Sequence, residues 1–168
     1  MKENVLRTGK KHPFLLGLLL IISILMVSCK PKPFFEETFK IAGQVWDYDQ
    51  HILFQPEITD TSGNYDIFLK LKINKSYPFK NLYFRHTLKD PSNNQRTDTL
   101  NINLISKSGL WNGSCDDENC EMLAPLAQKV NFSVTGRYLI ELDQFTRMDT
   151  LFGLQEIGLV IKHNNSPK

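Results

Sequence analysis

The sequence predicts an all-β fold, an antiparallel β-sandwich of the jelly-roll or immunoglobulin-like kind, with roughly eight strands and one or two short helical turns. Two observations support this prediction. Apolar residues alternate with polar ones in several short segments, which is typical of strands that bury one face and expose the other. Turn-forming residues separate these segments, as at residues 61–64, 90–94 and 135–136.

The alternation predicts the strands in chain order. Three short strands are expected at residues 34–41, 45–46 and 52–54, and Pro56 places the last of them at its end or on a sheet edge. The clearest run occupies residues 65–73, where Tyr, Ile and Leu take every second position. Further runs predict strands at residues 82–89, 99–104, 130–134, 138–142 and 157–161. Helical turns are expected within residues 118–128, despite Pro125, and within residues 143–149.

The N-terminus has the pattern of a bacterial lipoprotein signal peptide. A basic start is followed by an uncharged stretch at residues 14–27 and then by Ser28 and Cys29. That stretch is shorter than the roughly 20 apolar residues of a membrane-spanning helix, which disfavours an uncleaved anchor. We therefore expect residues 1–28 to be removed and Cys29 to be acylated, which attaches the protein to a membrane by lipid.

The remaining chain has the size of one domain. We expect a tether at residues 29–33, a single β-sandwich domain at residues 34–163 and a disordered tail at residues 164–168. Cleavage leaves 16 basic and 17 acidic residues, so the mature chain has a net charge of −1. Both signs are interspersed, which argues against nucleic-acid binding.

The two other cysteines, Cys115 and Cys120, are predicted to form a disulfide because export places them in an oxidising compartment. Two free thiols or a metal site remain as alternatives. The four residues between the cysteines lack the ligand spacing of a calcium loop, and a zinc site needs further ligands nearby. We expect no metal and no cofactor.

No catalytic residue is predicted. His86 falls on an apolar strand face, where a packed histidine is the favoured interpretation. No nucleophile elbow and no phosphate-binding glycine loop are present in the sequence. The carboxylates of Asp47, Asp49, Glu57 and Asp60 are interpreted as solvated loop residues, although they leave a glycan hydrolase open as a minor alternative.

Aromatic residues are the better functional lead. Trp46, Trp111, Tyr48 and Tyr77 fall in or beside turn-like segments. Exposed aromatic rings stack on sugars or anchor protein interfaces, so Trp46, Trp111 and Tyr77 are candidate binding residues. Tryptophan also closes the open ends of sandwiches, and this structural role is the favoured interpretation of the two Trp residues.

Several motifs follow one another along the mature chain, in the order Tyr77-Pro78-Phe79-Lys80-Asn81-Leu82-Tyr83, Asp98-Thr99-Leu100, Gly109-Leu110-Trp111-Asn112-Gly113, Gly136-Arg137-Tyr138, Gly153-Leu154 and Ile157-Gly158-Leu159. Together with Cys29, Trp46 and Asp60 they resemble the GldH family of gliding-motility lipoproteins of the Bacteroidota, over nearly the whole mature chain. The resemblance implies a non-catalytic accessory of the cell-envelope motility machinery. It brings no catalytic residues with it.

Thr99 and Thr150 each lie in an Asp-Thr-Leu triplet. Such triplets resemble the acceptors of O-glycans on exported proteins of this phylum, so both residues are candidate glycosylation sites.

Two main hypotheses therefore stand. The first is a lipoprotein that binds protein components of the motility or secretion machinery. The second is a carbohydrate-binding sandwich that displays Trp46 or Trp111. Lys30 after the acylated cysteine favours the outer membrane, and the lack of an acidic cluster close to Cys29 favours its periplasmic side over the cell surface.

Overall fold

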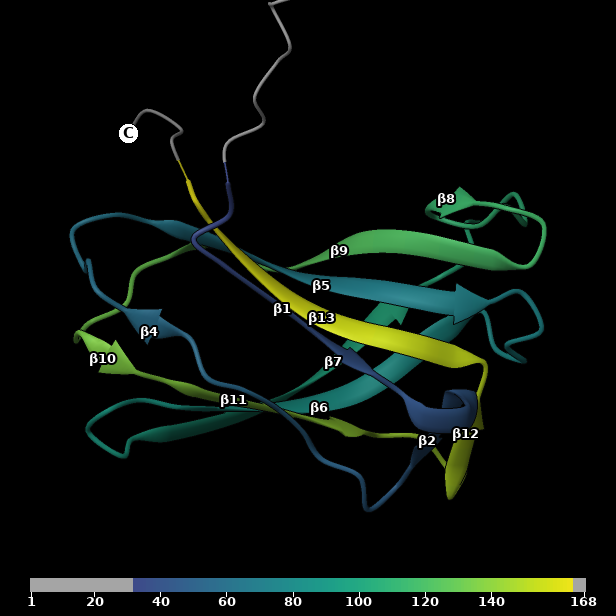
Figure 1. Cartoon of the computed structure of the whole chain (residues 1–168), viewed down its shortest axis with the longest axis horizontal. Helices are drawn as coiled ribbons and strands as arrows, with labels where there is room; N and C mark the ends of the chain where they lie inside the picture. Colours follow the sequence, from purple (N-terminus) through teal and green to yellow (C-terminus); the bar gives the residue numbers. More distant parts are fainter. Residues whose placement is uncertain (1–31, 165–168) are drawn as a thin grey trace, which may run out of the picture. The chain divides into compact units, whose positions relative to one another are not determined.

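Two antiparallel β-sheets face each other in the computed structural model, which describes residues 32–164 (Figure 1). Cys29, the predicted signal peptide at residues 1–28 and residues 165–168 lie outside the described residues. The first sheet has the order β1 (Phe35–Lys40), β13 (Leu154–His163), β5 (Tyr65–Asn74), β9 (Asn119–Val130) and β8 (Ser114–Cys115). The second sheet has the order β3 (Ile52–Phe54), β11 (Leu139–Gln144), β6 (Asn81–Lys89) and β7 (Gln95–Asn103).

Two short strand pairs complete the arrangement. β4 (Glu57–Ile58) pairs with β10 (Gly136–Arg137), and β2 (Val45–Asp47) pairs with β12 (Thr150–Phe152). The prediction of an all-β sandwich is confirmed. Within residues 32–164 no helix is long and apolar enough to cross a membrane.

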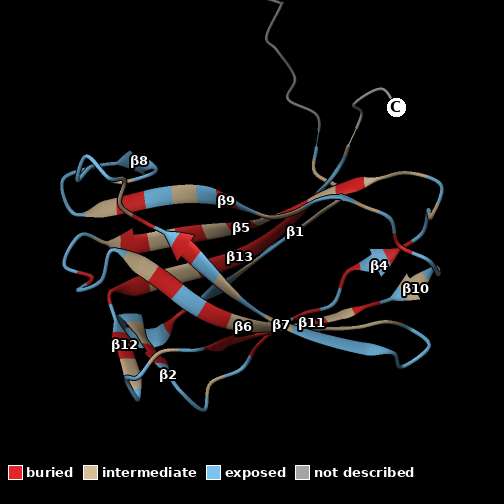
Figure 2. Cartoon of the chain, turned by 180° about the vertical axis from the view of Figure 1, so that it is seen from behind, coloured by how far each residue is buried: buried red, intermediate tan, exposed pale blue. Residues whose placement is uncertain are grey.

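The core forms where the inward faces of the two sheets meet. Every second residue of β5, from Tyr65 to Ile73, is buried, and its neighbours along the strand are half-buried (Figure 2). From the second sheet, β6 contributes Leu82 and Phe84 and β11 contributes Leu142, and each is at most 1% exposed. Removing a large apolar side chain from water stabilises a fold by about 2 kcal/mol, so this contact surface determines which face of each strand turns inward.

The predicted helical turn at residues 118–128 is wrong, because this segment is strand β9. β9 pairs with β5 along its length, with irregular register where Ile67 and Phe68 face Ala127 and Pro125. β8 covers only Glu121 and Cys120, so Pro125 lies where the outer side of β9 has no strand neighbour. A proline, which lacks a backbone N–H, is tolerated at such an edge. The alternation of this segment is hidden in the sequence by these irregularities.

Two further local predictions are wrong. β9 ends at Val130, so residues 131–134 do not form the predicted strand. Lys129, the residue before Val130, has a positive φ of 54°. β11 reaches Gln144 and is followed by an irregular loop instead of a helical turn. The helical turn that the described residues do contain is a 3₁₀ turn at Ala42–Gln44.

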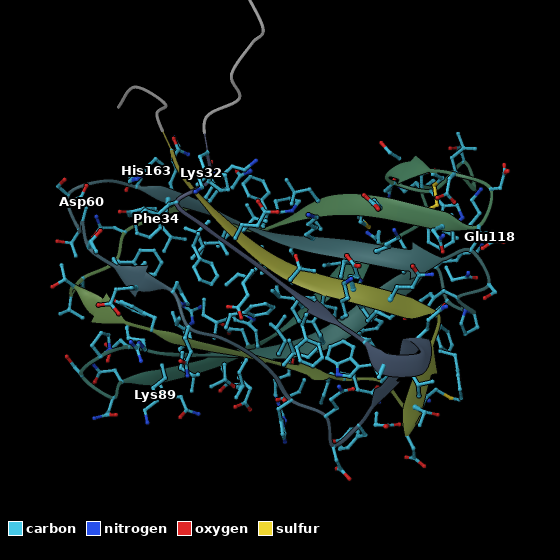
Figure 3. The ribbon with its side chains drawn as sticks, in the orientation of Figure 1. Lys32, Phe34, Asp60, Lys89, Glu118 and His163 are labelled. Atoms are coloured by element: carbon cyan, nitrogen blue, oxygen red, sulfur yellow. A yellow bond between two sulfur atoms is a disulfide. The ribbon has the colours of Figure 1, made fainter. Side chains whose placement is uncertain are left out.

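An aromatic cluster closes the end of the sandwich where the described chain begins and ends. Phe34 packs edge-on against Tyr65 and His163, with ring centroids 5.2 and 5.3 Å apart. Tyr65 continues to Phe132 at 5.3 Å, and Phe132 to Tyr138 at 4.9 Å. Figure 3 labels Phe34 and His163 side by side at this end, with Glu118 at the opposite end. We call these five residues the aromatic cluster.

The described chain includes one residue, Asn164, beyond the predicted domain boundary at residue 163. The Asn164 backbone N–H donates to Asn64 O at 2.8 Å, and its side-chain amide donates to both carboxylate oxygens of Asp66 at 2.8 and 3.0 Å. These hydrogen bonds join Asn164 to the residue before β5 and to β5 itself.

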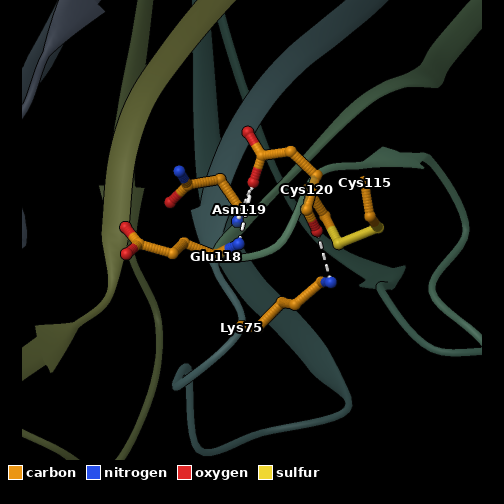
Figure 4. Close-up of a disulfide and its surroundings, with 6 residues drawn as sticks. Lys75, Cys115, Glu118, Asn119 and Cys120 are labelled. Carbon is orange, nitrogen blue, oxygen red and sulfur yellow. Dashed lines mark hydrogen bonds between the residues drawn. A yellow bond between two sulfur atoms is a disulfide. The ribbon is translucent and has the colours of Figure 1, made fainter.

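The predicted disulfide is present and joins β8 to β9 (Figure 4). Cys115 and Cys120 are paired residues across the two strands. The Asp116 carboxylate accepts hydrogen bonds from the backbone N–H groups of Glu118 and Asn119 at 2.9 and 2.7 Å, which lowers the pKa of Asp116. Lys75 donates to the backbone carbonyl of Asp116, so the loop is also tied to the end of β5.

Replacing both Cys115 and Cys120 by serine should lower the free energy of unfolding by about 2 kcal/mol, because the bond closes a short loop. Urea unfolding followed by far-UV circular dichroism measures this loss. The native protein treated with dithiothreitol is the control and should show the same loss. Complete unfolding of the double variant in buffer would contradict a merely local role for the bond.

Candidate functional site: an aromatic pocket

A pocket of about 530 Å³ opens at the end of the sandwich opposite the aromatic cluster. β5 connects the two ends, and its ten residues span about 30 Å. The lining is mostly aromatic or apolar, and its members are Tyr48, Tyr77, Phe79, Asn81, Tyr83, Phe145, Thr146, Arg147 and Met148.

One wall of the pocket is the loop after β11, which a buried glutamine holds in place. Gln144 is 1% exposed, and its amide nitrogen lies 3.1 Å from Met148 O and 3.2 Å from Asp149 O. Its amide oxygen accepts a hydrogen bond of 2.6 Å from the Thr146 hydroxyl. A buried amide with satisfied donors and acceptor fixes one conformation of the backbone around it. The loop therefore presents Phe145 and Met148 in a defined geometry.

The opposite wall is the turn after β5, and Gly153 shapes it. Gly153 has a φ of +92°, and a Cβ atom there would lie 3.2 Å from the Cα of Tyr77. The Gly153 carbonyl accepts from the Asn74 N–H at 2.7 Å. Only glycine adopts this backbone conformation at low cost while allowing the close approach. Gly153 thus positions Tyr77, whose hydroxyl donates to Asn81 O at 3.3 Å and whose burial raises the pKa of its phenol.

The mouth of the pocket exposes large apolar surface. Tyr83 is 42% exposed, and Tyr48, Phe145 and Met148 are each 47–48% exposed. Apolar side chains gathered in one place on a protein surface mark a binding site more often than scattered ones do. The pocket can therefore bind an apolar or aromatic group, with Arg147 as the charged residue of its lining.

An ion-pair network lies directly beside the pocket, on the outer face of the second sheet. Arg85 donates to Asp143 Oδ2 from Nε at 3.0 Å and from Nη2 at 2.9 Å, across paired residues of β6 and β11. His51 Nδ1 lies 2.5 Å from Asp143 Oδ1 and 3.6 Å from Glu141 Oε1. The hydrogen bond to Asp143 raises the pKa of His51. The network ties His51, the residue directly before β3, to β11 and β6, close to Phe145 in the chain.

His51, Glu141 and Asp143 also have the spacing of metal ligands, since their ligand atoms lie within 4.8 Å of one another. Both oxygens of Asp143 already have partners, one in Arg85 and one in His51. A buried carboxylate satisfied in this way acts as a structural ion pair. The cluster was not predicted from the sequence, because His51, directly before β3, meets Glu141 and Asp143 of β11 only through the pairing of these strands in the fold.

The structure separates the three candidate binding aromatics. Tyr77 lines the pocket. Trp46 is completely buried in β2, and its indole N–H donates to Gln50 O at 2.9 Å, so its ring has the structural role that the sequence favoured. Trp111 is half-buried and forms an isolated bridge with Ile105, away from the pocket. Phe145, Arg147 and Met148 were not predicted as site residues, because their segment was interpreted as a helical turn.

The candidate glycosylation residues differ in exposure. Thr99 is exposed on β7, and Thr150 is half-buried at the start of β12. Glycosylation of either remains a prediction, which the intact mass of the native protein tests.

Fold and site together define a β-sandwich domain with an aromatic pocket at one end. The chain belongs to the GldH lipoprotein family, whose model matches residues 34–161. The gliding motility lipoprotein GldH of Flavobacterium johnsoniae is 28% identical over 158 residues, covering 89% of this chain and 96% of that relative. A gliding motility lipoprotein GldH homolog of Christiangramia forsetii is 26% identical over 150 residues, covering 85% of this chain and 91% of that relative.

The substitution Gly153→Ala should lower the free energy of unfolding by about 1–3 kcal/mol, because alanine is strained at this φ and its methyl group meets Tyr77. Gly109→Ala is the matched control, since Gly109 has a φ of +83° with no atom within 4 Å of the added Cβ. The control should cost about 1 kcal/mol, the conformational part alone. Equal losses in the two variants, measured by urea unfolding, would show that the contact with Tyr77 is unimportant.

The His51–Asp143 contact should make stability depend weakly on pH. Because the pKa of His51 is raised in the folded state, its contribution is fully present below the unfolded pKa of about 6.5 and is lost as pH rises through the folded pKa. The His51 side chain is 55% exposed, so solvent screening keeps the effect below about 1 kcal/mol. Urea unfolding at pH 5.5 and 8.5 should show this loss in the native protein and not in His51→Gln. A loss of the same size in the variant would assign it to other groups.

Proposed function

We propose that this protein is a non-catalytic, membrane-anchored lipoprotein that takes part in gliding motility by binding a protein partner in its aromatic pocket. Membership of the GldH lipoprotein family supports the anchor. The names of the Flavobacterium and Christiangramia relatives support the role in gliding motility. The observation that supports binding is the exposed aromatic surface around a preformed pocket.

The composition of the pocket favours a protein over other ligands. Tyrosine, phenylalanine, methionine and arginine are enriched at the centres of protein interfaces, and all four types line this pocket. Aromatic side chains lose little conformational freedom when a partner covers them, because they have only two rotatable bonds. The hydrogen bonds of Gln144 already hold the loop after β11, so this loop also loses little conformational freedom on binding. An apolar side chain of the partner would fill the pocket between Phe145 and Tyr83.

The position of the pocket suits an anchored protein. The described chain begins at Lys32, three residues after Cys29, and enters the sandwich at the aromatic cluster. A lipid on Cys29 would therefore tether the sandwich by the end that lies about 30 Å from the pocket. We place the anchor in the outer membrane because Lys30 follows Cys29, and on its periplasmic side because the sequence has no acidic cluster close to Cys29. The partner would be a component of the motility or secretion machinery.

The two alternative functions have less support. A carbohydrate site combines aromatic rings with polar groups for sugar hydroxyls, and this pocket offers both, with Asn81, Thr146 and Arg147 beside its rings, but it contains neither of the tryptophans that the carbohydrate hypothesis names. Trp46, one of the proposed stacking residues, is buried. A glycan hydrolase needs two facing carboxylates, and no carboxylate lines this pocket.

Phe145→Ser should abolish or strongly reduce colony spreading while leaving the amount and membrane anchoring of the protein unchanged. An aromatic residue at the centre of an interface commonly contributes about 2 kcal/mol, or roughly 30-fold in affinity. Phe39→Ser is the matched control, because Phe39 is 38% exposed on β1, outside the pocket. Colony spreading, immunoblotting of membrane fractions and in-cell crosslinking from position 83 provide the measurements.

The control variant should spread normally and keep the crosslinks of the native protein. Normal spreading of both Phe145→Ser and a gene deletion would remove the motility role itself. Normal spreading of Phe145→Ser together with failure of the deletion would move the partner site elsewhere on the surface. Tyrosine resonances of the pocket that shift on titration with a cell-envelope polysaccharide would favour the carbohydrate alternative.

A further inference from the structure

A second cavity, of about 430 Å³, opens between the two sheets on the side where β7 and β9 are their outer long strands. Both sheets contribute apolar side chains to it, among them Ile67, Leu126 and Val130 from the first sheet and Leu88, Leu100 and Ile140 from the second. The inward faces of two sheets are normally closed by their own side chains. Here part of the inner surface is left open to solvent, and we call this opening the groove.

The backbone of β7 forms one rim of the groove. Among the described strands β7 is hydrogen-bonded to β6 alone, so the N–H and C=O groups of its other edge have no strand partner. β7 is nine residues long, contains neither proline nor glycine, and pairs with β6 without a register shift. Natural proteins usually protect such an edge by proline, a bulge, shortening or charged side chains, and β7 has the last of these in Arg96 and Asp98, which pair with each other near its start. β9 across the groove has both Pro125 and register irregularities, and β3, at the other edge of the second sheet, is three residues long.

The polar end of the groove carries an unsatisfied group. His86 and Asp98 are paired residues of β6 and β7, and both line the groove. His86 Nδ1 is buried and has no hydrogen-bond partner among the described residues, and burial lowers the pKa of this imidazole. Buried polar atoms are nearly always hydrogen-bonded in folded proteins. Arg96 and Asp98, the charged residues at the rim, pair with each other at 2.7 Å.

We propose that β7 and the groove together receive an extended segment of a partner protein, which adds to the sheet as a strand beside β7 and places alternate apolar side chains in the groove. An unpaired, regular backbone edge provides the main-chain hydrogen bonds of strand addition, and the apolar groove beside it provides places for alternate side chains. A lipid chain or a glycan would fill the groove without forming hydrogen bonds to the free backbone edge of β7. A polar side chain of the added strand would also lie close to His86.

A second copy of this chain fits the groove less well than a partner segment. If two copies of β7 paired edge to edge, the inward positions of the incoming strand would include Arg96 and Asp98. Those charged side chains would then face the apolar lining. The partner segment instead needs apolar residues at every second position, with a neutral or hydroxyl-bearing residue near His86. This inference is independent of the aromatic pocket, which lies at the end of the sandwich and shares no lining residue with the groove.

The test uses the full mature lipoprotein in phospholipid nanodiscs and a nine-residue peptide of alternating valine and threonine as the probe. Amide hydrogen exchange of β7 should slow at least tenfold at saturating peptide, and the ¹⁵N shift of the His86 ring should change. A peptide with the same side chains but N-methylated at every residue should give no protection, because it has no N–H group to donate to β7. This comparison leaves the protein unaltered.

Leu126→Lys should abolish the protection, because Leu126 lines the groove. Leu123→Lys is the matched control, since Leu123 lies on the same strand, is 44% exposed and does not line the groove. Equal binding of the N-methylated peptide, or equal loss in both lysine variants, would overturn the proposal. Protection that grows with protein concentration alone would indicate a second copy instead. Protection produced by added palmitate would indicate a lipid chain.

Discussion

Burial of one face of β5 is the constraint on which the rest of this structure depends. β5 lies between β13 and β9, and its inward residues from Tyr65 to Ile73 contact the core over the whole length of the sandwich. Because side chains alternate along a strand, this burial fixes the register of both neighbouring strands. The length of β5 also sets the distance between the two ends of the domain. The aromatic cluster begins at Tyr65, where β5 starts, and the pocket begins just beyond its end at Asn74.

The buried Gln144 connects this core to the binding surface. It follows Asp143, whose ion pairs hold the outer face of the same strand, so opposite sides of β11 are fixed at adjacent residues. Its amide nitrogen also lies 3.4 Å from Trp46 O, which ties β2 to the loop after β11. A polar residue in a core adds specificity when all of its hydrogen bonds are made. The order of the pocket wall therefore depends on a residue that does not itself contact the solvent.

Much of the fold could be predicted from local pattern, and most of the site could not. The alternation at residues 65–73 identifies β5 because one face is buried and the other is not. Strand β9 was not predicted, because Pro125 and the irregular register with β5 interrupt the alternation of apolar and polar residues along it. Tyr77 was identified as a candidate binding residue, but Trp46 has similar turn-like surroundings and is buried in the hydrophobic core, on a strand that pairs with β12. Phe145 and Met148 acquire their positions from hydrogen bonds to Gln144, a context that no local pattern reveals.

The way in which the chain enters the sandwich has a mechanical consequence for an anchored protein. Phe34 leads directly into β1, and β1 runs along β13 through six antiparallel residue pairs from Phe35 to Lys40. A pull between the proposed lipid on Cys29 and the proposed partner at the opposite end would be directed along these strands. The hydrogen bonds between β1 and β13 are then loaded together in shear, rather than opened one after another from an end. Tension applied in this way would therefore be shared among the six residue pairs of β1 and β13.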